Sequence, residues 1–133
     1  MSPFKIDGID HLVLRVGNLA DSRRFYEGLL GCMVERELPD IGLFQLRAGR
    51  QLIDLVPIGG KLAGDLEVVQ KNRNLDHFCL TISPFEPDVI TELMISAGVS
   101  CSEAATRYGA DGYGLSIYVT DPDGNTVELK ATR

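Results

Sequence analysis

IDHLVLRV occupies residues 9–16, and a similar stretch, LDHFCLTI, occupies residues 75–82. Both are rich in branched apolar side chains and predict strands, and each has a histidine at its third position. A glycine follows the histidine after 20 residues in the first half and after 21 in the second. The later segments LIDL and TVEL also correspond. This correspondence indicates a duplicated unit.

The segments between the repeated stretches predict the same order of elements in both halves, a strand, a helix and three strands. The helices are expected at 18–31, where Asn18 can cap, and at 83–98, where Pro87 lies in the first turn. The remaining strands are expected at 32–37, 43–48, 51–57, 99–102, 114–119 and 125–130. We therefore predict an α+β fold in one domain of residues 1–133, with modules at 8–57 and 75–131 joined by a connector.

Composition excludes several classes of partner. Thirteen Lys and Arg face 19 Asp and Glu, a net charge of −6, so neither nucleic acid nor a membrane surface is an expected partner. The longest stretch without charged residues, 93–102, is far shorter than the roughly 20 residues of a membrane span. The N-terminal sequence lacks the apolar core of a signal peptide, and the three cysteines are widely spaced. These features predict a cytoplasmic protein with reduced thiols.

Each half carries a histidine in its first strand and a carboxylate in its last, giving His11 with Asp54 and His77 with Glu128. A single histidine in an apolar strand is more often a core side chain than a ligand, and a single glutamate usually faces water. Here, however, the only two histidines occupy equivalent positions of a repeat. In a pseudo-twofold arrangement the four side chains would converge. Two imidazole nitrogens and two carboxylates together suit one divalent metal ion, either Ni²⁺, Zn²⁺, Co²⁺, Mn²⁺ or Fe²⁺.

The segments IDHLVLRV, FYEGLLG, LDHFCL and DPDGNTVELK resemble the vicinal oxygen chelate superfamily, which holds glyoxalase I, fosfomycin resistance enzymes, extradiol dioxygenases and bleomycin-binding proteins. The resemblance covers essentially the whole chain. It implies paired βαβββ modules that form a barrel-like cavity around a metal, frequently in a homodimer. It places metal ligands at His11, His77 and Glu128, and at Asp54 where glyoxalase I has glutamate; the fosfomycin resistance enzymes use only two histidines and one glutamate. Because aspartate is shorter, Asp54 is expected to bind directly from farther away, to bind through water or to lie behind the ligands.

The resemblance also implies substrate contacts. Arg15, four residues after His11 on the same strand face, is similar to the arginine that binds the glutamyl carboxylate of glutathione; an ion pair at the barrel mouth is the equal alternative. Ile58 replaces an asparagine that also holds glutathione, which argues against glutathione itself. RYGADGYG, residues 107–114, predicts a mobile rim loop in which Arg107, Tyr108 and Tyr113 touch substrate, with a loop without function as the equal alternative.

The activity implied is that of a lyase or isomerase acting on a small α-hydroxycarbonyl or thiol adduct, with glutathione or another thiol as co-substrate. The metal would stabilise an enediolate, and Glu128 or Asp54 would move the proton between adjacent carbons. Two alternatives stay open. One is a metal-dependent thiol transferase of the fosfomycin-resistance type, and the other is a small-molecule sequestration protein of the bleomycin-binding type.

Overall fold

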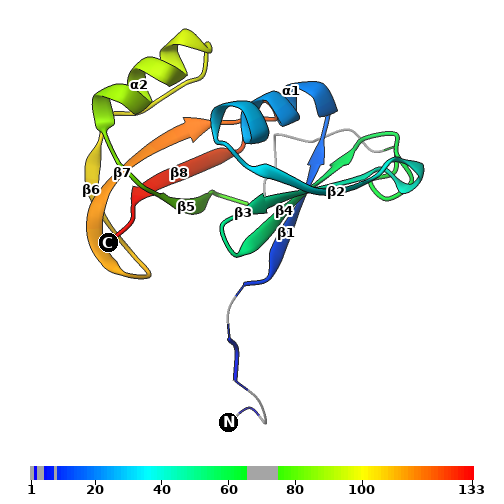
Figure 1. The fold of residues 1–133 in the computed structure, drawn as a ribbon, viewed down its shortest axis with the longest axis horizontal. Coiled ribbons are helices and arrows are strands. Elements are labelled where there is room, and N and C mark those ends of the chain that lie inside the picture. Colours follow the sequence, from blue (N-terminus) through cyan, green and yellow to red (C-terminus); the bar gives the residue numbers. More distant parts are fainter. Residues whose placement is uncertain (1, 3–4, 8, 66–74) are drawn as a thin grey trace. The chain divides into compact units, whose positions relative to one another are not determined.

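A computed structural model describes residues 2, 5–7, 9–65 and 75–133 (Figure 1). The chain divides into two compact units, residues 1–67 and 68–133. Each unit contains one four-stranded sheet, which confirms the predicted α+β fold with a duplicated module. Residue 8, the predicted start of the first module, and residues 66–74 of the predicted connector lie outside the described residues.

The first unit has one parallel and two antiparallel strand pairs. Its elements are β1 (His11–Val16), α1 (Leu19–Arg23), η1, a π-helix (Arg24–Leu29), β2 (Met33–Leu38), η2, a 3₁₀ turn (Pro39–Ile41), β3 (Leu43–Ala48) and β4 (Gln51–Pro57). The strand order is β1-β4-β3-β2, with β1 parallel to β4. The Asn18 side chain accepts a hydrogen bond of 2.9 Å from the Asp21 N–H, which confirms the predicted cap.

The second unit repeats this topology. Its elements are β5 (Phe78–Ile82), α2 (Pro87–Ser96), β6 (Ala105–Gly109), β7 (Gly112–Thr120) and β8 (Thr126–Ala131). The strand order is β5-β8-β7-β6, and β5 is parallel to β8. The strand predicted at 99–102 is wrong, because Cys101 forms only an isolated bridge with Val119 and the corresponding strand is β6.

The predicted loop at 107–114 is also wrong, because this segment forms the β6–β7 hairpin. Tyr108 and Tyr113 are paired across the two strands, and their rings meet edge to face with centroids 4.9 Å apart. Gly112 has φ of 95°, a conformation that favours glycine and allows the tight turn. The glycines that suggested a loop therefore serve a hairpin.

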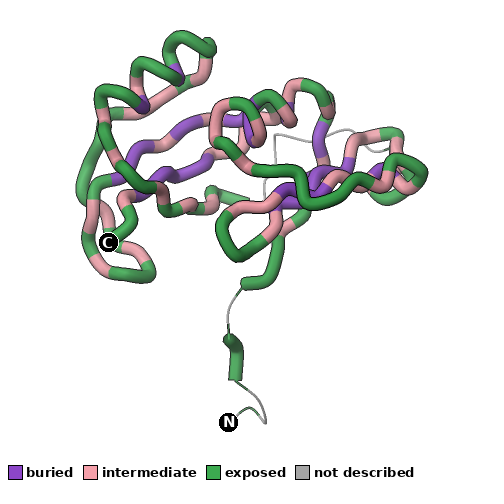
Figure 2. The backbone as a smooth tube through the Cα atoms, in the orientation of Figure 1, coloured by how far each residue is buried: buried purple, intermediate pink, exposed green. Residues whose placement is uncertain are grey.

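Buried side chains concentrate on the inner strands of both sheets (Figure 2). Ile53 and Leu55 of β4 belong to the apolar face, and α1 packs against β4. Because side chains alternate along a strand, the residue between them, Asp54, lies on the opposite face. Each buried polar residue of the sheets lies next to a buried apolar residue in its own strand. These polar residues are Gln45, Asp54, Ser116, Glu128 and Lys130.

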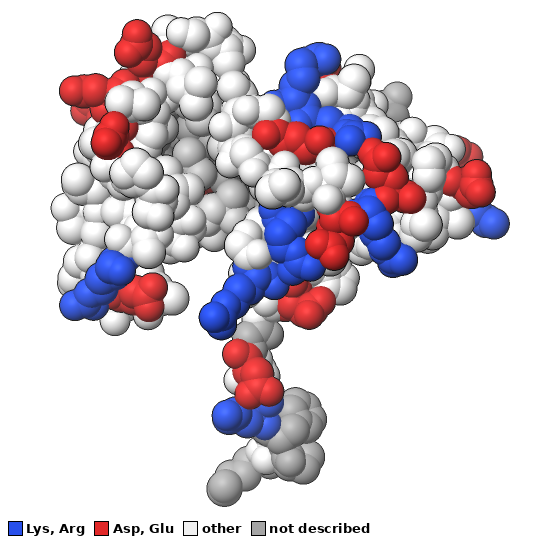
Figure 3. Space-filling model, viewed as in Figure 1, with Lys and Arg blue, Asp and Glu red and all other residues white. Residues whose placement is uncertain are grey.

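Charged side chains of both signs are interleaved on the face of the first unit in Figure 3. Arg23 pairs with Glu27 and Glu37, and Arg47 pairs with Glu35 at 3.0 Å. At these pairs, positive charge is therefore locally compensated. No helix in the described part of the chain is long and apolar enough to cross a membrane.

Candidate functional site

The first unit brings His11 and Asp54 to one face of its sheet. Asp54 is the cross-strand partner of Val13, which lies two residues after His11 in β1. Residues two apart on a strand share a face, so the histidine and the carboxylate are neighbours on it. Their charges interact, since Asp54 contributes to raising the pKa of His11.

Asp54 is a buried carboxylate with one oxygen held and the other unpaired. Only 3% of the residue is exposed. Gln45, its cross-strand partner in β3, donates from Nε2 to Oδ2 at 3.0 Å, and Arg36 donates to the Gln45 Oε1. Oδ1 is buried and has no hydrogen-bond partner among the described residues. Because an unpaired buried oxygen is costly, this atom is suited to bind a cation.

His11 is oriented by the preceding residue. Its Nδ1 lies 2.7 Å from Oδ2 of Asp10. A carboxylate only accepts, so Nδ1 carries the hydrogen and Nε2 of the neutral ring keeps its lone pair for a metal. The hydrogen bond to Asp10 is the largest cause that raises the pKa of His11 above 6.5; desolvation opposes it, and the Asp54 charge adds to it.

The second unit repeats the arrangement with His77 and Glu128. Nδ1 of His77 lies 2.7 Å from Oδ2 of Asp76, and Nε2 lies 3.3 Å from Oε1 of Glu128. Glu128 is 6% exposed. Its cross-strand partner in β5 is Cys79, which lies two residues after His77. The strand register between histidine and carboxylate is therefore the same in both units.

The face around Glu128 also holds aromatic and cationic groups. Tyr118, its partner in β7, meets the His77 ring edge to face with centroids 5.6 Å apart. The guanidinium carbon of Arg107 lies 4.2 Å from the centre of the Tyr118 ring. Arg107 also donates from NH1 to the carbonyl and hydroxyl oxygens of Ser116, at 2.8 and 2.9 Å. The predicted substrate-binding arginine is thus fixed on the Glu128 face.

Cys79 shares this face but is not an activated nucleophile. The pKa of its thiol is raised from 9.0 to about 11; burial is the largest cause, the Glu128 charge adds to it, and the Lys130 charge opposes it. The thiol is therefore protonated near neutral pH.

Two of the predicted substrate-binding residues are Arg15, which contacts the backbone of its own unit, and Tyr113, which is largely exposed. Arg15 donates from Nε and NH2 to the carbonyl oxygen of Ala63 at 3.2 and 2.9 Å. Tyr113 is 74% exposed. Their roles toward a substrate stay predictions.

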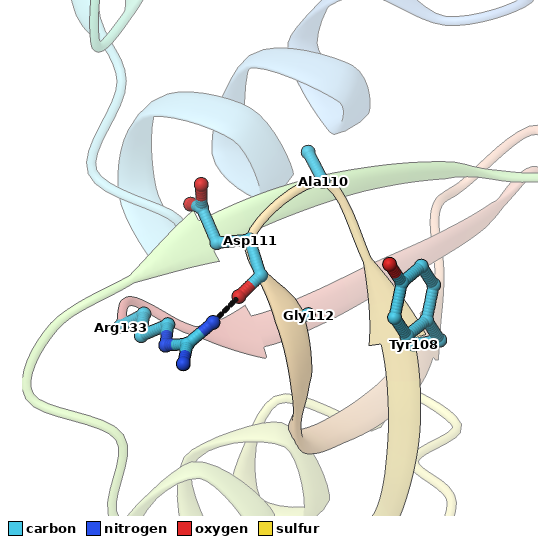
Figure 4. A pocket seen from close by; sticks show the side chains of 5 residues that line it. All are labelled: Tyr108, Ala110, Asp111, Gly112 and Arg133. Carbon is cyan, nitrogen blue, oxygen red and sulfur yellow. Dashed lines mark hydrogen bonds between the residues drawn. The ribbon is translucent and has the colours of Figure 1, made fainter.

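A shallow pocket lies at the β6–β7 hairpin (Figure 4). It is lined by Tyr108, Ala110, Asp111, Gly112 and Arg133. Arg133 donates to the carbonyl oxygen of Asp111 across it. The lining contains none of the predicted metal ligands, so the candidate site is elsewhere.

The donor atoms of the His77 and Glu128 pair fit a divalent cation. Two ligand atoms about 2.1 Å from one ion lie about 3.0 to 3.4 Å apart in octahedral or tetrahedral coordination, and His77 Nε2 and Glu128 Oε1 match this separation. An ion pair with protonated His77 has the same geometry. Within the described residues, no three His, Cys, Asp or Glu side chains form a metal-binding group. Each unit thus contributes a pair of candidate ligands.

Sequence reasoning missed the residues that support these pairs. Asp10 and Asp76 could have been found, because an Asp-His dipeptide occurs in both repeats. Gln45 and Tyr118 are cross-strand neighbours of the two carboxylates, and a single sequence does not specify that register.

The sequence profile of the Glyoxalase/Bleomycin resistance protein/Dioxygenase superfamily matches residues 8–129. Virulence protein STM3117 of Salmonella typhimurium is 32% identical over 130 residues, or 93% of this chain and 83% of that protein. Its crystal structure matches with a TM-score of 0.73 and 30% identity, covering 98% of this chain and 100% of that chain.

Two further solved structures are similar. The integron cassette protein VCH_CASS1 of V. cholerae has a TM-score of 0.76 and 29% identity, with 98% of both chains covered. The fosfomycin resistance protein FosX of Listeria monocytogenes has a TM-score of 0.71, covering 97% of this chain and 96% of that chain. Its 22% identity makes this a similarity of fold.

Proposed function

Because this chain belongs to the Glyoxalase/Bleomycin resistance protein/Dioxygenase superfamily, we propose that it is a divalent-metal-dependent enzyme of glyoxalase type. Its substrate would be a small α-hydroxycarbonyl compound or a thiol adduct of one. The observation that carries the proposal is the repeated pair of histidine and buried carboxylate at one register, with the Asp54 Oδ1 left unpaired. The pairs would act together, within one chain or across a homodimer.

His11, His77 and Glu128 are the proposed ligands, with Asp54 as the fourth. A divalent metal at this position supplies Lewis-acid stabilisation of negative charge on neighbouring substrate oxygens. Asp10 and Asp76 accept from Nδ1 of the two histidines, which would leave each Nε2 available to hold the ion.

Proton transfer between adjacent carbons falls to a buried carboxylate. Glu128 is the better candidate, because one oxygen approaches His77 and the other is free to take and return the proton. Asp54 already accepts from Gln45 through Oδ2. It is therefore better placed to hold charge than to move a proton.

Thiol transfer to an epoxide is the second candidate. The bond between Gln45 and Asp54 favours it, because an Asp54 held away from the metal would leave two histidines and one glutamate. The resemblance assigns that ligand set to fosfomycin resistance enzymes. Sequestration of a small molecule without catalysis is the remaining alternative, and it does not require the metal.

Metal analysis tests the ligand set. Protein purified without chelator and reloaded with Ni²⁺, Co²⁺, Zn²⁺ or Mn²⁺ should bind about one ion per site. The double variant His11→Ala/His77→Ala should lose this metal, and Glu128→Gln should bind it more weakly. Asp88→Asn removes one negative charge from the exposed first turn of α2 and should bind metal normally. Equal uptake by wild type and the double-histidine variant would exclude the site.

Turnover assays separate the activities. Hemithioacetals of methylglyoxal with glutathione and other thiols should be converted in the presence of metal and not after chelation. Metal-dependent opening of an epoxide antibiotic by a thiol, without isomerase activity, would identify a transferase. Ligand binding that is indifferent to chelation, without turnover, would identify a sequestration protein.

A further inference from the structure

Lys130 is a buried lysine on the face of the second sheet that carries Glu128. It lies two residues after Glu128 in β8, and its cross-strand partners are Thr81 and Ser116. Only 4% of the residue is exposed. A lysine so deeply buried normally has an ion-pair or hydrogen-bond partner.

Two glycines make room for the Lys130 side chain. A Cβ atom placed on Gly109 would lie 3.0 Å from Cε of Lys130, and one placed on Gly114 would lie 3.1 Å from Nζ. The lysine chain therefore extends from β8 across the β6–β7 hairpin. Any larger residue at either glycine would crowd it.

The Lys130 ammonium has no hydrogen bond or ion pair within the described part of the chain. Ser116, its neighbour in β7, already accepts from Arg107. Arg107 and Lys130 are thus two cationic side chains that both neighbour Ser116 on this face. In its bonds to Ser116, Arg107 uses only the NH1 donor. Although the residue as a whole is 4% exposed, its Nζ is not one of the fully buried polar atoms, so it stays accessible from this face. An accessible ammonium beside a guanidinium, without a partner from the described residues, is suited to an anionic ligand.

We infer that Lys130, together with Arg107, binds an oxyanion group, a carboxylate or a phosphate-like group, of a small ligand. The ammonium supplies up to three hydrogen-bond donors, and the guanidinium supplies a second positive charge. That this ligand is the substrate rests on the proposed function. In that case the substrate carries an anionic substituent in addition to the neighbouring oxygens.

Thermal denaturation with simple anions tests the site. Metal-free wild-type protein is melted in phosphate, in acetate and in chloride at equal ionic strength. At an anion concentration about ten times its dissociation constant, the melting temperature should rise by roughly 4 °C relative to chloride. A rise in phosphate alone assigns a phosphate-like group, and a rise in acetate alone assigns a carboxylate.

Lys130→Met should abolish the anion-specific rise, and Lys61→Met, at an exposed position, should retain it. Gly114→Ala keeps the charge but displaces Nζ, so it should weaken the rise even if Lys130→Met fails to fold. No rise in wild type with either anion, or an equal rise in Lys130→Met, would overturn the inference. Metal uptake is measured on the same proteins. Loss of the anion effect with normal metal uptake supports the inference, whereas a wild type that takes up no metal refutes only the proposed metal enzyme.

Discussion

Replacing Asp54 with asparagine should have opposite effects on the metal-free and the metal-loaded protein. The carboxylate is 3% exposed, and its Oδ1 has no partner among the described residues. Burying such a charge costs more than burying a neutral amide, by about 1 kcal/mol at least. Metal-free Asp54→Asn should therefore melt roughly 4 to 8 °C above wild type, given a unit of this size.

Metal should reverse that order. At 100 times its dissociation constant, a metal stabilises the wild type by about 2.7 kcal/mol, and Asp54→Asn should lose much of this gain. Scanning calorimetry with and without Zn²⁺ measures both effects. Asp121→Asn is the control, because Asp121 is 4% exposed but accepts bonds from the backbone of Asp123 and from the backbone and side chain of Asn125. It should destabilise the protein with or without metal.

Two results would refute this reasoning. If metal-free Asp54→Asn is less stable than wild type, the buried oxygen is already satisfied. If its metal-dependent stabilisation equals that of wild type, Asp54 is not a ligand.

Three further predictions concern neighbouring groups. Asp10→Asn should lower the pKa of His11 toward 6.5, and an NMR titration of the two histidines measures this change. The stabilisation by the His11–Asp10 pair is present below pH 6.5 and is lost as the pH rises through the raised pKa of His11. In metal-free protein at pH 8, Cys79 should react with iodoacetamide roughly 100-fold more slowly than free cysteine, because its pKa is about 11, and Glu128→Gln should accelerate the reaction. Gln45→Leu leaves the Asp54 carboxylate without its hydrogen bond and should destabilise metal-free protein by about 1 to 3 kcal/mol in urea denaturation.

The duplication and the positions of the two pairs could be predicted because they depend on local patterns. Alternation correctly placed His11 opposite the buried face of β1, and the spacing of Asn18 and Gly31 correctly bounded the first helical segment. The carboxylate, however, follows the histidine by 43 residues in the first unit and by 51 in the second. The strand register is nevertheless the same, because the connections between strands absorb the difference.

The hairpin at 107–114 and the supporting residues depend on information beyond local patterns. Three glycines in eight residues are typical of a loop, but here Gly112 makes the turn and Gly114 accommodates a lysine from another strand. Lys130 itself is an unremarkable residue in sequence. Its burial follows from the pairing of β8 between β5 and β7, which no single segment encodes.

The two units differ in the charge that each leaves unpaired. The first buries the Asp54 carboxylate with one oxygen free, and the second holds the Lys130 ammonium on the face of Glu128 without a partner among the described residues. Burying the unpaired Asp54 oxygen reduces the stability of the ligand-free protein, and a ligand of opposite charge would stabilise either arrangement. A cation for Asp54 and an anion for Lys130 are together what a metal and an anionic substrate provide. Neutralising Asp54 should therefore stabilise the free protein and weaken its response to metal, whereas neutralising Lys130 should weaken its response to the anion and leave the response to metal.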